Sequence, residues 1–242
     1  MGDDTGPRLA VLIDADNARA SFCSELMSEI SKYGVATVRR AYGDWTTTNL
    51  NGWKMHLHKH AIQPIQQFSY TSGKNSTDSS LIIDAMDLLH GGDLEGFCIV
   101  SSDSDFTRLA TRIRETGSTV IGFGEEKTPE AFIAACDRFV FLEVIADKTQ
   151  DRDSSAKRYP KELLDILGTA IDAVSSDDGW SPLTWVGGNL RKIDPSFDPR
   201  NYGFQKLGQL VRSIDWIEVK EVEPKDNSGA VNLYVRRKEA LD

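Results

Sequence analysis

Aspartates stand at three points of the sequence where a buried segment ends or a helical pattern begins. Asp14 follows the apolar run LAVLI, and Asp78 opens a helical pattern. Asp103 and Asp105 follow the apolar run FCIV. Carboxylates that converge on one site repel one another unless a cation lies between them. Oxygen ligands without His or Cys suit Mg²⁺ or Mn²⁺, which can generate a hydroxide nucleophile and stabilise the leaving oxygen of a phosphodiester. The pattern therefore points to metal-assisted phosphoryl cleavage.

Asp78 is the most informative of these aspartates. On a helical wheel it lies near the centre of the apolar arc formed by residues 81–89, whereas Asp87 points to the opposite side. An unpaired buried charge is too costly, so Asp78 must cap its helix, pair with a cation or bind a metal. Capping explains any one of the aspartates alone. Three separate positions that all supply Asp are harder to explain by capping.

The elements that must position these aspartates form an alternating series up to about residue 145. Short apolar runs predict strands at 9–13, 35–42, 61–68, 96–100, 119–123 and 139–142. Helical spacing is found at 18–33, from Trp53 to Leu57, and at 81–89, 106–115 and 129–136. Such β-α-β units predict a parallel sheet with helices on both faces, that is, a three-layer α/β domain. Ligands of such sheets bind at the carboxyl ends of the strands, where Asp14 and Asp103 are expected.

The residues from 159 onward have a different pattern. Residues 146–158 are polar throughout and predict a linker, and the polar segment 69–76 predicts a loop. Amphipathic helices are expected at 162–174, 183–190 and 204–214, and alternating strands at 216–222 and 231–237 are expected to form a hairpin through 224–229. Three helices followed by a hairpin outline a small winged helix-turn-helix domain of α+β type.

Composition limits the class of protein. The chain has 242 residues, a net charge of −9 and 27% charged residues, which is ordinary for a globular protein. No segment approaches the roughly 20 apolar residues of a membrane span. Three cysteines without a Cys-x-x-Cys pair argue against a disulfide framework or a zinc ribbon and favour the cytoplasm. Residues 1–147 hold 21 acidic and 13 basic residues, which fits carboxylates around a metal but also a solvated acidic surface.

Three motifs together resemble a known family. Leu12-Ile13-Asp14-Ala15-Asp16-Asn17, Lys74-x3-Asp78-x5-Asp84 and Ser101-x-Asp103-Ser104-Asp105-Phe106 resemble the NYN domain, the LabA-like branch of the PIN-like nucleases, over residues 8–145. The resemblance implies a metal-dependent ribonuclease, a hydrolase with an acidic site on a Rossmann-like sheet. It implies metal-holding carboxylates at Asp14, Asp78, Asp103 and Asp105. Asn17 would contact the substrate or support a ligand, and Lys74 would contact a phosphate.

The second part, residues 159–238, resembles an OST-HTH (LOTUS) domain, a winged helix linked to RNA binding. The resemblance is carried by the helical pattern, by Gly203-Phe204-x2-Leu207 and by Trp216 before the wing. We expect RNA contacts from Lys206, Arg212, Arg236 and Arg237, although neighbouring acids dilute this basic surface. Single-stranded or structured RNA is the expected partner, because the major groove of an RNA duplex is too narrow for a helix. Protein partners of this domain remain possible.

Several residues near the motifs remain ambiguous. Asp84 either forms a salt bridge or binds the metal, and Asp16 either holds its loop or supports the site. Ser101, Ser102 and Ser104 are expected to hydrogen-bond a phosphate or to orient carboxylates, because no paired histidine makes a serine nucleophile. The histidines of the segment His56-Leu57-His58-Lys59-His60 are expected on a solvated basic helix face rather than in a zinc site. Tyr42, Trp45 and Trp53 either stack on bases or pack the sheet edge.

The sequence thus favours a metal-dependent endoribonuclease with a winged helix that binds RNA. One alternative is an RNA-binding adaptor that does not cut. A second is a phosphatase of the haloacid-dehalogenase type, in which Asp14 would be the nucleophile, although Ala18 stands where that family has Thr or Val.

Overall fold

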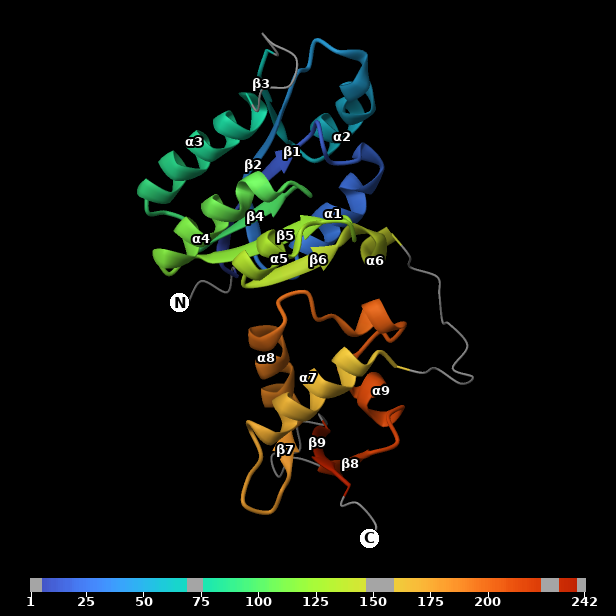
Figure 1. Cartoon of the computed structure of the whole chain (residues 1–242). Coiled ribbons are helices and arrows are strands. Elements are labelled where there is room, and N and C mark those ends of the chain that lie inside the picture. Colours follow the sequence, from blue (N-terminus) through green and yellow to red (C-terminus); the bar gives the residue numbers. More distant parts are fainter. Residues whose placement is uncertain (1–5, 69–75, 147–158, 223–230, 239–242) are drawn as a thin grey trace. The chain divides into compact units, whose positions relative to one another are not determined.

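The computed structural model describes residues 6–68, 76–146, 159–222 and 231–238. They form two compact units, residues 1–148 and 149–242, which are treated separately below (Figure 1). Except for residues 76 and 146, the loop expected at 69–76 and the linker expected at 146–158 lie outside the described residues.

Among its described residues, the first unit contains a parallel sheet with the strand order β3-β2-β1-β4-β5-β6. Its strands are β1 (Arg8–Asp14), β2 (Val35–Gly43), β3 (Gln63–Gln66), β4 (Gly96–Val100), β5 (Thr119–Gly124) and β6 (Arg138–Phe141). Strands β1 and β4 are apolar along nearly their whole length because both faces are covered. The strand order reverses between β1 and β4, and the carboxyl ends at such a switch point form a crevice.

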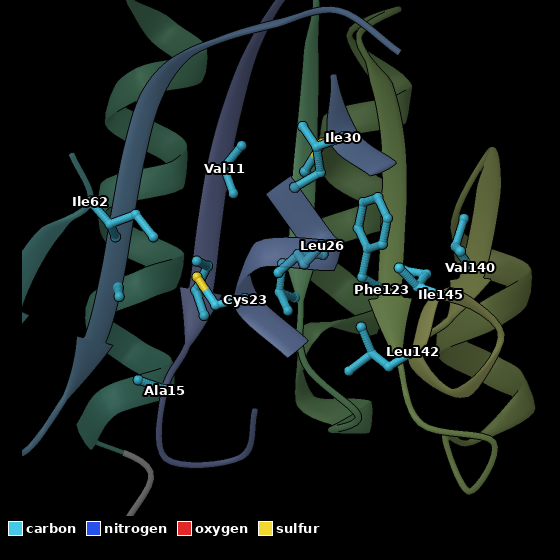
Figure 2. Packing of buried hydrophobic residues seen from close by; sticks show 14 of the residues in the cluster. Val11, Ala15, Cys23, Leu26, Ile30, Ile62, Phe123, Val140, Leu142 and Ile145 are labelled. Atoms are coloured by element: carbon cyan, nitrogen blue, oxygen red, sulfur yellow. The ribbon is translucent and has the colours of Figure 1, made fainter. Parts of the chain in front are cut away.

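Helices cover both faces of this sheet, which confirms the three-layer α/β domain (Figure 1). One face packs against α1 (Cys23–Ile30), α2 (Lys54–Lys59) and α6 (Leu142–Ala146), and the other against α3 (Ser76–His90), α4 (Thr107–Glu115) and α5 (Glu130–Ala135). Side chains alternate along β1, so Val11 (Figure 2) and, by the same face, Ile13 join the first core, and Leu12 joins the second. By the same alternation Asp14 lies on the face covered by α3 and α4.

The helices and strands differ from the expectations mainly at their ends. The helix expected at 18–33 consists of a 3-10 helix at Ala20–Phe22 followed by α1. A left-handed backbone at Ala61, with φ of 50°, turns the chain after α2, so β3 begins later than the strand predicted at 61–68. Helix α6 was not predicted, because its five residues are too few for a helical period to be recognised.

The second unit confirms the winged helix-turn-helix. It contains α7 (Lys161–Asp172), α8 (Leu183–Ile193), α9 (Leu207–Arg212) and an antiparallel sheet of β7 (Ser181–Pro182), β9 (Asn232–Arg237) and β8 (Ile217–Val222). A 3-10 helix at Pro199–Tyr202 ends at Gly203, with φ of 81°. Helix α9 begins later than the helix predicted at 204–214, because the backbone at Lys206 is extended, with φ of −140°. The expected turn at 224–229 lies outside the described residues. No described helix in either unit is long and apolar enough to cross a membrane.

Strand β5 leaves no room for a side chain at Gly122. A Cβ atom there would lie 2.4 Å from Phe139 Cδ2 and 2.8 Å from Cys136 Sγ, and both neighbours are buried. We expect Gly122→Ala to lower the free energy of unfolding by about 1–3 kcal/mol, because overpacking forces these side chains off their rotamers. Urea unfolding measures the loss. Gly52→Ala is the matched control in the same unit, since its Cβ would meet Ala20 Cβ at an ordinary 3.5 Å. Equal stability of both variants would contradict this packing.

Candidate metal centre

Three of the four predicted ligands come together in the first unit. Carboxylate oxygens of Asp78, Asp103 and Asp105 lie within 4.8 Å of one another. Asp78 projects from the first turn of α3. Asp103 and Asp105 lie just after β4, at the start of the 3-10 helix Ser104–Phe106. Asp78 is only 8% exposed, Asp103 is half-buried and Asp105 is exposed. The cluster therefore has a buried side against the helix and an open side that a ligand can reach.

The electrostatics of the cluster are unfavourable when no cation is bound. Burial raises the pKa of Asp78 to about 6, with further contributions from Asp14, Asp103, Asp105 and Asp16, in that order. Each of these carboxylates disfavours the charged form of Asp78. A group of oxygen donors under this repulsion is the donor set that a hard divalent cation such as Mg²⁺ or Mn²⁺ prefers. The residues present therefore fit such an ion.

Asp14, the fourth predicted ligand, is fully buried at the end of β1 and is not part of the group of three. Its Oδ2 accepts hydrogen bonds from Asn17 Nδ2 at 2.8 Å and from Ser101 Oγ at 2.7 Å. Burial raises the pKa of Asp14, and these two bonds oppose the rise. Asp14 is close enough to raise the pKa of Asp78. Asp14 thus lies at the edge of the cluster, where hydrogen bonds from Asn17 and Ser101 hold its carboxylate.

Ser101 joins Asp14 to the loop that carries the cluster. Its hydroxyl donates to Asp14, and its Oγ accepts the backbone N–H of Asp103 at 3.1 Å. The side chain is buried. Sequence analysis expected Ser101, Ser102 and Ser104 to bind a phosphate or to orient carboxylates, and Ser101 takes the second of these roles. Ser102 Oγ accepts the N–H of Glu125 at 2.9 Å, and Ser104 is exposed. Ser101 is the first residue after β4, the strand paired with β1, which brings its hydroxyl to Asp14.

The capping alternative holds for one aspartate of the cluster. Asp103 is the N-cap of the 3-10 helix Ser104–Phe106, and its carboxylate accepts the N–H of Asp105 at 3.0 Å. Asp78 lies inside α3, two residues after the first described residue of that helix, and so is not its N-cap. Capping therefore fixes the loop at Asp103 without explaining why Asp78 lies against it.

The two ambiguous aspartates have separate roles. Asp16 is exposed and accepts a hydrogen bond from the Thr77 hydroxyl at 2.9 Å, which ties the loop after β1 to α3. Thr77 was not recognised in the sequence. Asp84 forms a salt bridge with Arg40 and accepts a hydrogen bond from the Tyr42 hydroxyl. Of the two roles predicted for Asp84, a salt bridge or a metal ligand, the structure shows the salt bridge.

The other residues of the first unit that were predicted to make contacts are Asn17, Lys74 and the aromatic residues. Asn17 donates its amide to Asp14, so it supports a carboxylate of the site. Lys74 lies outside the described residues. Tyr42 and Trp53 are buried, which favours packing of the sheet over stacking on bases for both.

The basic residues expected to bind RNA in the second unit are mostly paired with acids. Arg212 pairs with Glu221, Arg236 with Glu218 at 2.7 Å, and Arg237 with Asp172 at 2.9 Å. Arg236 also lies over the Trp180 ring, 4.6 Å from its centroid. Lys206 is exposed at the start of α9 and forms no ion pair with the described residues. These ion pairs confirm the prediction that neighbouring acids reduce the positive charge of this surface.

Comparison with known proteins agrees with this architecture. The chain matches the NYN domain over residues 8–143 and the OST-HTH/LOTUS domain over residues 157–228. No curated protein matches it. The two domains follow one another in the order that the sequence motifs predicted.

Several solved structures are similar to parts of the chain. A protein of unknown function from Vibrio parahaemolyticus is 17% identical, with a TM-score of 0.49 over 57% of this chain and 94% of its own. An uncharacterized protein from Nitrosomonas europaea is 29% identical, with a TM-score of 0.30 over 38% of this chain and 90% of its own. A protein fragment from Chromobacterium violaceum is 38% identical, with a TM-score of 0.28 over 35% of this chain and 90% of its own. Because the NYN match covers more than half of the sequence, the chain belongs to the NYN-domain family and carries an OST-HTH/LOTUS domain after its NYN domain.

Proposed function

We propose that this protein is a metal-dependent endoribonuclease that hydrolyses RNA phosphodiester bonds at the aspartate cluster of its NYN domain. One observation carries the proposal. The carboxylate of Asp78, from α3, meets those of Asp103 and Asp105, from the segment after β4, within 4.8 Å at the switch point of the sheet. The capping role of Asp103 does not require the other two acids to converge there, and the repulsion among the three costs stability unless a cation is bound.

Asp78, Asp103 and Asp105 would hold the Mg²⁺ or Mn²⁺ ion, with Asp14 as a further ligand or as a support beside them. When bound, such an ion stabilises the negative charge that develops on the phosphate and lowers the pKa of a nearby water molecule. The chain itself orients the carboxylates. Ser101 and Asn17 hold Asp14 in place, and the backbone of the loop after β4 holds Asp103.

Substrate contacts would come from the rim of this cluster. Ser104 and Asp105 are exposed there, and Ser102 and Asn17 lie next to the carboxylates. We assign Lys74 a phosphate contact on the strength of the family motif alone. The serine hydroxyls and the Asn17 amide can donate hydrogen bonds to phosphate oxygens, which orients an RNA strand without reading its sequence.

The winged helix would bind RNA and bring it to the NYN domain. Lys206 forms no ion pair with the described residues, whereas Arg212, Arg236 and Arg237 are paired with acids. Few phosphates would be neutralised, so we expect modest binding with a shallow dependence on salt. Single-stranded or structured RNA fits such a surface better than a regular duplex.

The burial of Asp14 weighs against the phosphatase alternative. A nucleophilic carboxylate must be exposed to the phosphorus that it attacks. The Asp14 side chain is fully buried, and its Oδ2 accepts two hydrogen bonds.

The test is cleavage of a circular, labelled single-stranded RNA by the full chain, with Mn²⁺, with Mg²⁺ and with a chelator. We expect the circle to be opened and then shortened with either ion and to stay intact with the chelator. A single-stranded DNA circle of the same sequence is the control for RNA specificity. RNA that is bound but intact in every lane would contradict the nuclease and support the adaptor. Cleavage that persists with the chelator would contradict the metal.

The pairing of Asp84 predicts that it does not bind the metal. Asp84→Asn weakens the pair with Arg40 and the bond from Tyr42, so we expect a loss of about 1–3 kcal/mol in the free energy of unfolding. RNA cleavage at saturating Mn²⁺ should stay within about threefold of wild type, far from the at least 10-fold effect of residues that support a metal. A much larger loss of cleavage in a folded variant would make Asp84 part of the metal site.

The hydrogen bonds of Ser101 predict a different outcome for its removal. Ser101→Ala removes one of the two hydrogen bonds to Asp14 Oδ2, leaving the bond from Asn17, and removes the side-chain acceptor of the Asp103 N–H. We expect a loss of about 1–3 kcal/mol in the free energy of unfolding and a fall in cleavage of about 10- to 100-fold. Ser104→Ala is the control for stability, because its side chain is exposed in the same loop. Unchanged cleavage by Ser101→Ala would show that the loop needs no such support.

A further inference from the structure

Two histidines of α2 and its C-terminal end lie next to a buried cysteine of α1. The metal-ligand atoms of Cys23, His56 and His60 lie within 4.8 Å of one another. The two imidazole rings are stacked, with centroids 6.3 Å apart and planes 4° apart. Sequence analysis expected these histidines on a solvated helix face, but both are half-buried, and of the three histidines of this segment only His58 is exposed.

One atom of this group has an unmet bonding requirement. His56 Nδ1 is buried and has no hydrogen-bond partner among the described residues. A buried polar atom without a partner costs about 1–3 kcal/mol, so its position needs an explanation. A metal ion among the three side chains would supply the missing partner. His60 Nε2, in contrast, lies 3.2 Å from Ser24 Oγ.

We propose that Cys23, His56 and His60 bind a zinc ion that ties α1 to α2. One sulfur and two imidazole nitrogens are the donors that zinc prefers and that Mg²⁺ and Mn²⁺ do not. Zinc bonds of about 2.3 Å to sulfur and 2.0–2.1 Å to nitrogen put neighbouring ligand atoms about 3.5 Å apart. Because the three atoms already lie within 4.8 Å of one another, they would have to close in by no more than about 1.3 Å. When the sulfur–zinc bond forms, the thiol proton leaves to solvent.

This site is separate from the aspartate cluster. Cys23 belongs to the apolar core on the α1 face of the sheet (Figure 2), whereas α3, which carries Asp78, packs on the opposite face. The fourth zinc position would take a water molecule or a neighbouring carboxylate. Glu25 is the nearest candidate in sequence, since it acts electrostatically on both Cys23 and His60. The ion would fix the position of α1, which follows the loop between β1 and the 3-10 helix at Ala20–Phe22. Asp14 ends β1 just before this loop, and Asn17 lies in it.

Cobalt(II) is the probe, because it replaces zinc and reports a thiolate ligand by a charge-transfer absorption band. We expect the full chain, stripped with chelator, to bind one Co²⁺ with this band, and zinc to abolish it. Cys23→Ser should remove the band. His60→Gln should lower the affinity at least about 100-fold, more than the loss of an outer-shell partner. His58→Ala changes the exposed histidine beside the site and should leave both the band and the Co²⁺ affinity unchanged.

A second control separates the two sites. Asp78→Asn should leave the thiolate band intact, because the aspartate cluster has no sulfur ligand. A folded wild-type protein without the band at any Co²⁺ concentration would overturn the proposal. A band that persists in Cys23→Ser would overturn it as well. If Cys23→Ser does not fold, His60→Gln decides, because the His60 side chain is half-buried whereas that of Cys23 is fully buried in the core. Unchanged Co²⁺ affinity of that variant would refute the site.

Discussion

Replacing Asp78 with asparagine is expected to abolish RNA cleavage and, in the ion-free protein, to increase stability. Cleavage should fall at least about 100-fold, because a direct ligand matters more than the outer-shell partners whose loss costs 10- to 100-fold. Stability should rise because the carboxylate is charged at a place where burial and four neighbouring acids disfavour charge. Opposite effects on activity and stability are typical of a residue kept for function.

The pH dependence follows from the pKa of Asp78. In the folded protein this pKa is about 6, above the ordinary value of 3.8. The folded state therefore holds its proton more tightly than the unfolded state between these values. Without divalent ions, the free energy of unfolding should fall as pH rises from about 4 to about 6 and stay low above that range. At neutral pH the asparagine variant should be more stable by about 1–3 kcal/mol.

Urea unfolding at several pH values, with chelator and with Mn²⁺, measures these differences. Saturating Mn²⁺ should stabilise the wild type, by about 2.7 kcal/mol at a concentration 100 times the Kd, and the variant much less. Asp87→Asn is the matched control, because Asp87 is exposed on the same helix and should change nothing. An Asp78→Asn protein that is less stable than wild type and still cuts RNA would refute the role of Asp78.

The fold and part of the site could be predicted because local patterns determine them. The continuous apolar runs of β1 and β4 are what burial on both faces requires, and the Asp residues at their ends fall at the switch point. Asp78 could be selected because its charge stands on the apolar side of an amphipathic helix. These inferences need only the periodicity of one element at a time.

The contacts that hold the site could not be predicted, because they join residues far apart in the sequence. Nothing local in Thr77 indicates that its hydroxyl binds Asp16. Ser101 could be expected to orient a carboxylate, but its spacing does not indicate that the carboxylate is that of Asp14. The same holds for Cys23, which approaches His56 and His60 only because α1 and α2 share one face of the sheet. Register and packing, rather than spacing, bring such groups together.

Asp103→Asn is the variant that separates loss of charge from loss of structure. The Asp103 side chain caps the following 3-10 helix by accepting the N–H of Asp105. Asparagine caps about as well as aspartate, because its carbonyl oxygen can accept the same bond. The loop should therefore keep its conformation while the metal loses an anionic ligand. We expect a free energy of unfolding within about 0.5 kcal/mol of wild type in the presence of chelator.

The most direct measurement is the single-turnover rate of RNA cleavage by Asp103→Asn and by wild type at the same saturating Mn²⁺ concentration. RNA binding by both proteins is measured in parallel, and Asp93→Asn, whose side chain is exposed, is the control. The metal centre predicts a rate at least about 100-fold lower for Asp103→Asn with unchanged RNA affinity. A variant that cuts at the wild-type rate would contradict the assignment of the aspartate cluster as the catalytic centre.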